Sequence, residues 1–181
     1  MNEKPLGTPP EVAKARRLSV LTCRGYAGLG LRLCLMAAAA WLMFSQLFLL
    51  HRVSGLGMFP AVKDGDLALA YRLQSDYAKG DVVLYRQNET LCLGRIVAGE
   101  NDVVMMSDSG DLQINGTTQG GEILYPTYAR EAGEYPLQVP EGMVYVLGDY
   151  RTQARDSRDF GPVPLDDILG KVITIVRRRG L

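Results

Sequence analysis

Gly94-Arg-Ile-Val-Ala-Gly-Glu-Asn-Asp102 lies in the middle of a series of short strand-forming runs and turns that extends on both sides of it. Runs rich in β-branched and large apolar residues alternate with Gly, Asn, Asp and Pro, as is typical of antiparallel strands joined by turns. Strands are expected at residues 67–73, 82–86, 95–97, 103–106, 112–114, 143–147 and 171–177, and one short helix at 164–169. This density of strands predicts a mainly β domain built from coiled antiparallel sheets.

An uncharged apolar segment precedes this domain. Residues 33–50 contain no charged side chain, and about 20 helical residues span a bilayer. Arg32 and Arg52 can extend their long side chains to the two interfaces. A cleaved signal peptide is the alternative, but its apolar core would be shorter, and residues 51–54 make a poor cleavage site. The sequence therefore predicts a transmembrane helix over residues 31–52, between an arm at 1–30 and an outer domain at 53–181.

Charge is distributed unevenly along the chain. The 20 basic and 20 acidic residues cancel, but residues 1–32 carry six basic and two acidic side chains. Positive charge before a membrane span favours the cytoplasmic side. We therefore expect a single-pass protein of the plasma membrane, with residues 1–30 in the cytoplasm and 53–181 outside. Membrane lipid is the expected partner of such a charge pattern, and nucleic acid is not.

Histidine and cysteine usage narrows the chemistry. His51 is the single histidine, at the membrane boundary, which excludes Ser-His-Asp catalysis and histidine-rich metal sites. Cys92 is the one cysteine beyond the apolar segment, so no disulfide is expected inside the outer domain. Its neighbours are leucines, which favours a buried structural thiol. We expect neither a metal nor a cofactor.

Three stretches together resemble the ordered boxes of type I signal peptidases. They are Gly55-Leu-Gly-Met-Phe-Pro60, the Gly94–Asp102 stretch and Gly148-Asp-Tyr-Arg followed by Asp156-Ser-Arg158. The resemblance runs from about residue 30 to the carboxyl end, with the boxes in the family's order and at compatible spacings. It implies a signal-peptidase-like β domain after one N-terminal transmembrane helix, with a groove where an extended peptide binds as an added strand.

The departures from that family fall on the chemistry. The family's nucleophilic serine stands immediately before Met-x-Pro, and its lysine general base immediately before the Arg of the second box. Gly57 and Gly94 occupy those two positions here, and Ala154 stands where the last box commonly has a serine. A serine needs an amine to take its proton, and glycine supplies neither group. The resemblance therefore implies the family's fold without its catalytic pair.

The scaffold of the boxes is otherwise present. The residues expected to line a peptide-binding groove are Gly55, Gly57, Met58, Pro60 and Gly94. Those expected to brace the fold are Arg95, Asp149, Arg151, Asp156, Ser157 and Arg158. In the family, the Asp and Arg of the last box form a salt bridge that braces the lysine strand, so a structural role is expected here.

Three functions are compatible with these features. The chain resembles catalytically degenerate signal-peptidase-like proteins encoded with pilus genes, which assist pilin polymerisation by sortases. That implies a non-catalytic chaperone or assembly factor, with an extended segment of a secreted protein, a pilin or a sortase as partner. The second is an active signal peptidase I that removes signal peptides by another arrangement; Ser54, three residues and about 10 Å of strand from Gly57, is a poor substitute. The third is an accessory subunit of an active peptidase.

Overall fold

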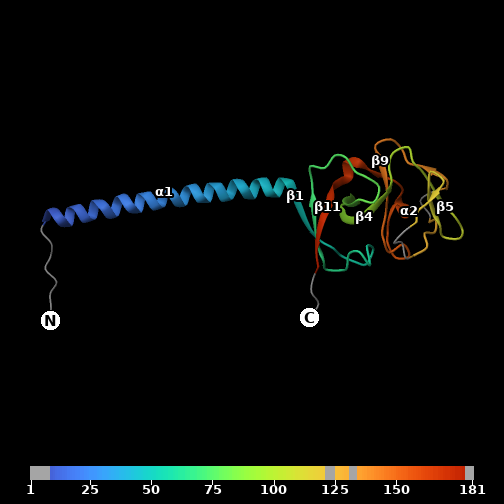
Figure 1. The fold of residues 1–181 in the computed structure, drawn as a ribbon, viewed down its shortest axis with the longest axis horizontal. Coiled ribbons are helices and arrows are strands. Elements are labelled where there is room, and N and C mark those ends of the chain that lie inside the picture. Colours follow the sequence, from blue (N-terminus) through green and yellow to red (C-terminus); the bar gives the residue numbers. More distant parts are fainter. Residues whose placement is uncertain (1–8, 121–124, 131–133, 178–181) are drawn as a thin grey trace. The chain divides into compact units, whose positions relative to one another are not determined.

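A computed structural model describes residues 9–120, 125–130 and 134–177, with side chains from residue 26 onward. Helix α1 (Pro9–Leu47) begins with two prolines, which suit the first turn because N–H groups there have no intrahelical partner. Its portion Tyr26–Leu47 has 22 residues and a mean hydropathy of 1.7, long and apolar enough to cross a membrane. The chain divides into two units, residues 1–45 and 46–181 (Figure 1).

The helix ends earlier than the predicted transmembrane segment, which extended to residue 52. Residues 48–52 instead form strand β1 (Phe48–Arg52), which pairs antiparallel with β2 (Leu67–Tyr71). Phe48 lies opposite Tyr71, with ring centroids 5.7 Å apart, and such cross-strand aromatic pairs stabilise a sheet. A continuous apolar run does not reveal where helix gives way to strand, so the boundary depends on this tertiary pairing.

Two antiparallel sheets make up the β domain (Figure 1). The larger has the order β1-β2-β11-β3-β4-β9-β10 and the smaller the order β7-β6-β5-β8. The remaining strands of the larger sheet are β3 (Val82–Gln87), β4 (Thr90–Ala98), β9 (Met143–Leu147), β10 (Val163–Pro164) and β11 (Ile168–Val176). Those of the smaller sheet are β5 (Val103–Met106), β6 (Leu112–Ile114), β7 (Thr117–Thr118) and β8 (Leu137–Gln138). The prediction of a mainly β domain after an apolar helix is confirmed.

The predicted helix at 164–169 is wrong. Leu165–Asp167 make a single 3₁₀ turn, and β11 begins directly after it. Gly170 lies inside β11, where a Cβ would come within 3.0 Å of the Tyr71 carbonyl oxygen. Glycine in a strand often marks such a close backbone approach. The one helix in the described part of this domain is α2 (Ser157–Phe160).

The core is continuous with the central strands of the larger sheet. One cluster of buried side chains comes mainly from β3, β4 and β9: Val83, Tyr85, Ile96, Val144 and Val146. A second cluster, which includes Val97, Val104 and Tyr145, packs the smaller sheet against the larger. Because β4 pairs with β3 on one side and β9 on the other, the second box lies at the centre of the sheet. Side chains from both neighbouring strands can therefore pack around Gly94.

Candidate functional site

The first box lies in the loop between β1 and β2. Met58 is 2% exposed and packs with Val53 and Val62 in a third core cluster. The backbone holds the loop closed, because Val62 N donates to Met58 O at 2.8 Å and Gly65 N to Val53 O at 2.9 Å. Met58 therefore anchors the loop. Of the other groove residues in this box, Gly55 and Pro60 are exposed and Gly57 is half-buried.

The last box holds Gly57 from the other side. Tyr150 N donates to Gly57 O at 2.9 Å. A Cβ on Gly148 would come within 3.0 Å of both that oxygen and the Ala154 Cβ, so position 148 requires glycine. A Cβ on Gly57 itself would lie 3.6 Å from the Ala154 Cβ, an ordinary contact. The nucleophile position therefore has room for a side chain, although the chain has none there.

Gly94 is the opposite case. It is buried, and a Cβ there would come within 3.0 Å of Val146 Cγ1 and to 3.2 Å of Tyr85 Cε1. Core side chains therefore fill the space into which the side chain of any larger residue at position 94 would extend. Gly94, which the sequence placed among the residues lining a peptide-binding groove, is closely packed in the structure.

Both glycines lie against the carboxyl end of β9. A Cβ on Gly94 would be 3.5 Å from the Leu147 carbonyl oxygen, and the next residue, Gly148, touches Gly57 O. All three boxes therefore meet around two consecutive residues, Leu147 and Gly148. The β9 pairing of β4 begins at Arg95, which lies opposite Leu147. Among the described strands, residues 90–94 have β3 as their neighbour on one side and no strand on the other.

Two ion pairs brace this region. Arg95 donates from Nε to Asp149 Oδ1 at 2.8 Å and from Nη2 to Asp149 Oδ2 at 2.6 Å, and its Nη1 donates to Gly80 O at 2.9 Å. Arg158 makes a similar two-pronged pair with Asp156, and both are buried. Such bidentate pairs fix geometry as well as charge. The second box is tied to the last one in this way.

Helix α2 and its N-cap residue also form hydrogen bonds to β9 and to the residue that follows it. The Asp156 carboxylate caps α2 and accepts a bond from Gly148 N at 3.1 Å. The Ser157 hydroxyl accepts from Val146 N at 3.0 Å. These contacts hold the end of β9 from the side. Nothing in the residue types alone indicated the bond to Val146.

Arg151 is fully buried without a carboxylate partner. Its Nη1 donates to Thr127 Oγ1 at 2.8 Å, while Nε and Nη2 have no hydrogen-bond partner in the described part of the chain. Burial, followed by the charge of nearby Arg158, lowers the pKa of Arg151 to about 10. The sequence did not predict Thr127 as its partner, because the two residues are 24 positions apart in unrelated segments.

Of the described lysines of the β domain, two form ion pairs, and Lys63 is exposed in the first-box loop. Lys79 is ion-paired with Asp102, and Lys171 with Asp81. Burial raises the pKa of the Cys92 thiol, opposed by the charge of Arg155, so the reactive thiolate is disfavoured. Within the described ranges, no three His, Cys, Asp or Glu side chains are grouped to hold a metal ion.

Comparison with known proteins identifies the family. The model of the signal peptidase family, peptidase S26, matches residues 27–177, and the chain belongs to this family. It is 31% identical over 134 residues to probable thylakoidal processing peptidase 2, chloroplastic, of Arabidopsis thaliana, covering 67% of this chain and 36% of that protein. It is 27% identical over 154 residues to signal peptidase I of Bacillus caldolyticus, covering 77% of this chain and 82% of that protein.

A crystal structure of a signal peptidase I from Enterococcus faecalis V583 is also similar, with 25% identity and a TM-score of 0.47 over 55% of this chain and 97% of that one. The chain spans little more than a third of the length of the thylakoidal peptidase. One N-terminal apolar helix in this chain fits the membrane anchor of a signal peptidase.

Proposed function

We propose that this protein is a membrane-anchored signal-peptidase-like protein that binds an extended segment of an exported protein without cleaving it. The observation that supports this proposal most directly is the presence of glycine at both positions of the family's catalytic pair, Gly57 and Gly94. Position 57 lacks a nucleophile, and the place of a base at position 94 is filled by Val146 and Tyr85. Losing both members of a unit that acts together removes nearly all of its acceleration.

A binding role is supported by the uncovered edge of β4. Residues 90–93 are exposed or half-buried and have no described strand as neighbour on the side away from β3, and an extended peptide can pair with such an edge as an additional strand. The first-box loop with Gly57 and the end of β9 adjoin this edge through Gly94 and Leu147. The partner we propose is an exported protein, with a pilin held for a sortase as the assembly role by family analogy.

The alternative of an active signal peptidase requires another nucleophile and base. Ser54 and Lys63 are both exposed in the loop between β1 and β2, and no hydrogen bond joins them, while Lys79 and Lys171 pair with carboxylates elsewhere. The Ser54 hydroxyl therefore has no described amine already in place to take its proton. This arrangement supports binding over cleavage.

A cleavage assay tests the proposal directly. The full-length protein in lipid vesicles is incubated with a precursor that carries a signal peptide, beside an active signal peptidase I. We expect no product above a buffer control, and the same result for Gly57→Ser alone. Turnover by the natural chain that is abolished by Ser54→Ala would establish the active alternative.

Photo-cross-linking tests binding. A photoreactive side chain replaces Leu56, which is 47% exposed beside Gly57, or Leu73, which is 63% exposed on another loop. We expect the precursor to be captured at position 56 and not at position 73. Equal capture at both positions would contradict binding at the first box.

A further inference from the structure

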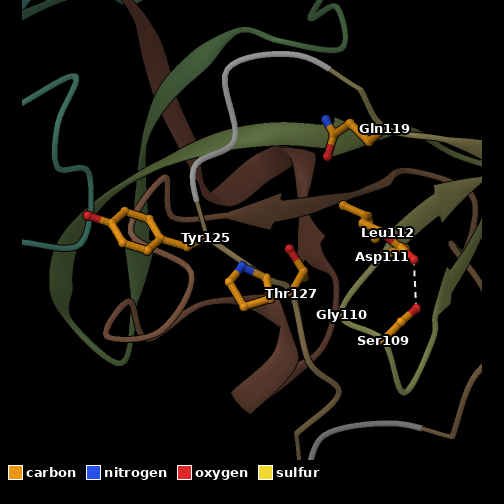
Figure 2. A pocket seen from close by; sticks show the side chains of 8 residues that line it. Ser109, Gly110, Asp111, Leu112, Gln119, Tyr125 and Thr127 are labelled. Atoms are coloured by element: carbon orange, nitrogen blue, oxygen red, sulfur yellow. Dashed lines mark hydrogen bonds between the residues drawn. The ribbon is translucent and has the colours of Figure 1, made fainter.

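A polar cavity of about 200 Å³ lies between β6 and the segment 125–127. Figure 2 shows the side chains of Gln119 and Thr127 on opposite sides of it, with the Gln119 oxygen and the Thr127 hydroxyl turned toward the space between them. Asp111 and Ser109 lie at one end, where Ser109 Oγ donates to Asp111 Oδ2 at 2.6 Å. At about 30 Å³ per water molecule, this volume admits one polar side chain.

Main-chain contacts hold the cavity walls. Gln119 N donates to Leu112 O at 2.7 Å, and Thr127 N donates to Gly110 O at 2.8 Å. Gly110 has φ of +87°, and a Cβ there would come within 3.0 Å of Pro126. The segment 125–127 is therefore seated directly on the turn between β5 and β6. The walls of the cavity are therefore fixed by hydrogen bonds and close packing within the domain.

The cavity contains an unused acceptor and an available donor. Gln119 Oε1 is buried and has no hydrogen-bond partner among the described residues, a state that costs free energy when the atom is removed from water. Thr127 Oγ1 accepts from Arg151 Nη1 at 2.8 Å, so its own O–H is free to donate inward. A ligand group with both a donor and an acceptor matches this pair.

A row of aromatic rings connects the cavity with the first box. Tyr125, on the cavity wall, contacts Tyr150 with ring centroids 4.6 Å apart and planes tilted by 35°, and Tyr150 lies 6.0 Å from Phe59. Tyr150 N in turn donates to Gly57 O. All three residues are half-buried. The row corresponds to about three residues of extended peptide.

We propose that this cavity is a subsite for an asparagine or glutamine side chain, about three or four residues along the bound peptide from its position at Gly57. The proposal rests on the proposed function, because it requires a peptide at the first box. A primary carboxamide offers N–H donors and a carbonyl acceptor, and it can pair with the Gln119 amide in either orientation. A cationic side chain would face Asp111, but the buried charge of Arg151 behind Thr127 opposes it.

Peptide binding to the full-length protein in detergent micelles tests the subsite. Fluorescent peptides carry an Ala-x-Ala motif in a Gly/Ser background, with glutamine, leucine or lysine at successive positions after the motif, and anisotropy gives their Kd. We expect glutamine at the third or fourth position to lower Kd roughly three- to tenfold relative to leucine. Gln119→Leu should remove this gain while the leucine peptides bind as before. Gln113→Leu, on β6 but outside the cavity, should keep it.

The outcomes separate the two proposals. If no peptide binds, including the background series, the proposed function fails. If the background peptides bind but Kd is the same for glutamine and leucine at every position, the subsite is wrong and peptide binding stands. A glutamine preference that persists in Gln119→Leu, or a stronger preference for lysine, would also overturn the subsite. The thermal midpoint of Gln119→Leu should equal or exceed that of the natural chain, because the variant removes an unpaired buried acceptor.

Discussion

Asp156 and Arg158 form a two-pronged ion pair that is closed to solvent: Arg158 Nε donates to Asp156 Oδ1 at 2.8 Å and Nη2 donates to Oδ2 at 2.7 Å. Each residue is 1% exposed. Arg151, whose carbonyl accepts a further bond from Arg158 at 2.6 Å, is just as buried, but no described carboxylate forms an ion pair with it. The charges of Asp156 and Asp149 offset its burial only in part. The two buried arginines therefore differ in that one is ion-paired and the other is not.

Arg158→Met should destabilise the domain by about 3–5 kcal/mol, because it leaves the Asp156 charge buried without its partner. Arg151→Met should leave stability unchanged or raise it by up to about 4 kcal/mol, because it replaces a buried charge that has no ion-pair partner by an apolar side chain. Thermal melting of the full-length protein, followed by circular dichroism, measures both. Equal losses in the two variants would show that the surroundings of Arg151 compensate its charge fully.

The pH dependence of that comparison follows from the lowered pKa of Arg151. The folded pKa is about 10 against an ordinary 12.5, so below pH 10 the folded state bears the full cost of the charge. Above pH 10 the folded protein releases this proton before the unfolded chain does, and the cost falls. The stability advantage of Arg151→Met should be constant from pH 7 to 9 and shrink above about pH 10. An advantage that grows with pH would have the wrong sign.

Gly94→Ala should lower stability by about 1–3 kcal/mol, since the added Cβ enters the space of Val146 Cγ1. Gly94→Lys should be at least as unfavourable, and Val146→Ala should recover part of the loss in either variant. Gly57→Ala is the matched control, because a Cβ there meets Ala154 at an ordinary 3.6 Å. Denaturation midpoints of the natural chain, the two Gly94 variants, their two combinations with Val146→Ala, and Gly57→Ala provide the measurement. If Gly94→Ala were neutral, the base position would be open and not filled.

Asp102 links the second box to the smaller sheet and should make stability fall in acid. Burial opposes its charge, but bonds from Lys79, Gly99 N and Asn115 outweigh that effect and lower the pKa of Asp102. A lowered folded pKa gives stability that is present above the unfolded value near 3.9 and lost as pH falls through the folded one. Asp102→Asn should therefore destabilise the domain at pH 7, and its stability should approach that of the natural chain as pH falls below the unfolded value. Asp108→Asn, at an exposed carboxylate, should show no such convergence.

The orientation across the membrane is tested by cysteine labelling. Two single-cysteine variants are made in a Cys-free background. Lys14→Cys places the cysteine before the candidate span, and Thr152→Cys places it at an exposed position after the span. The positive charge of residues 1–32 predicts that a membrane-impermeant maleimide labels position 152 on intact cells and position 14 only after permeabilisation. The reverse pattern would place the β domain in the cytoplasm.

Local signals predicted most strands correctly. Residues 103–106, 112–114 and 143–147 form strands with the expected bounds, because short β-rich runs there are closed by turn residues. The Asn115-Gly116 turn has φ of +54° and +76°, which these residues adopt readily. The helix at 164–169 and the end of the apolar helix were mispredicted, since both depend on strands brought in from elsewhere: Tyr71 faces Gly170 as well as Phe48.

The family's order of boxes, the apolar segment and the absence of a serine and a lysine at their positions could be read from the residues, because these are properties of residue identity and spacing. The space around Gly57 and the lack of space at Gly94 depend on the folded chain, since the side chains that fill position 94 come from β3 and β9. The burial of Arg151 without an ion-pair partner and the cavity beside Gln119 likewise depend on the tertiary structure. Close packing and hydrogen-bond satisfaction depend on distances between segments remote in the chain, which local sequence patterns do not specify.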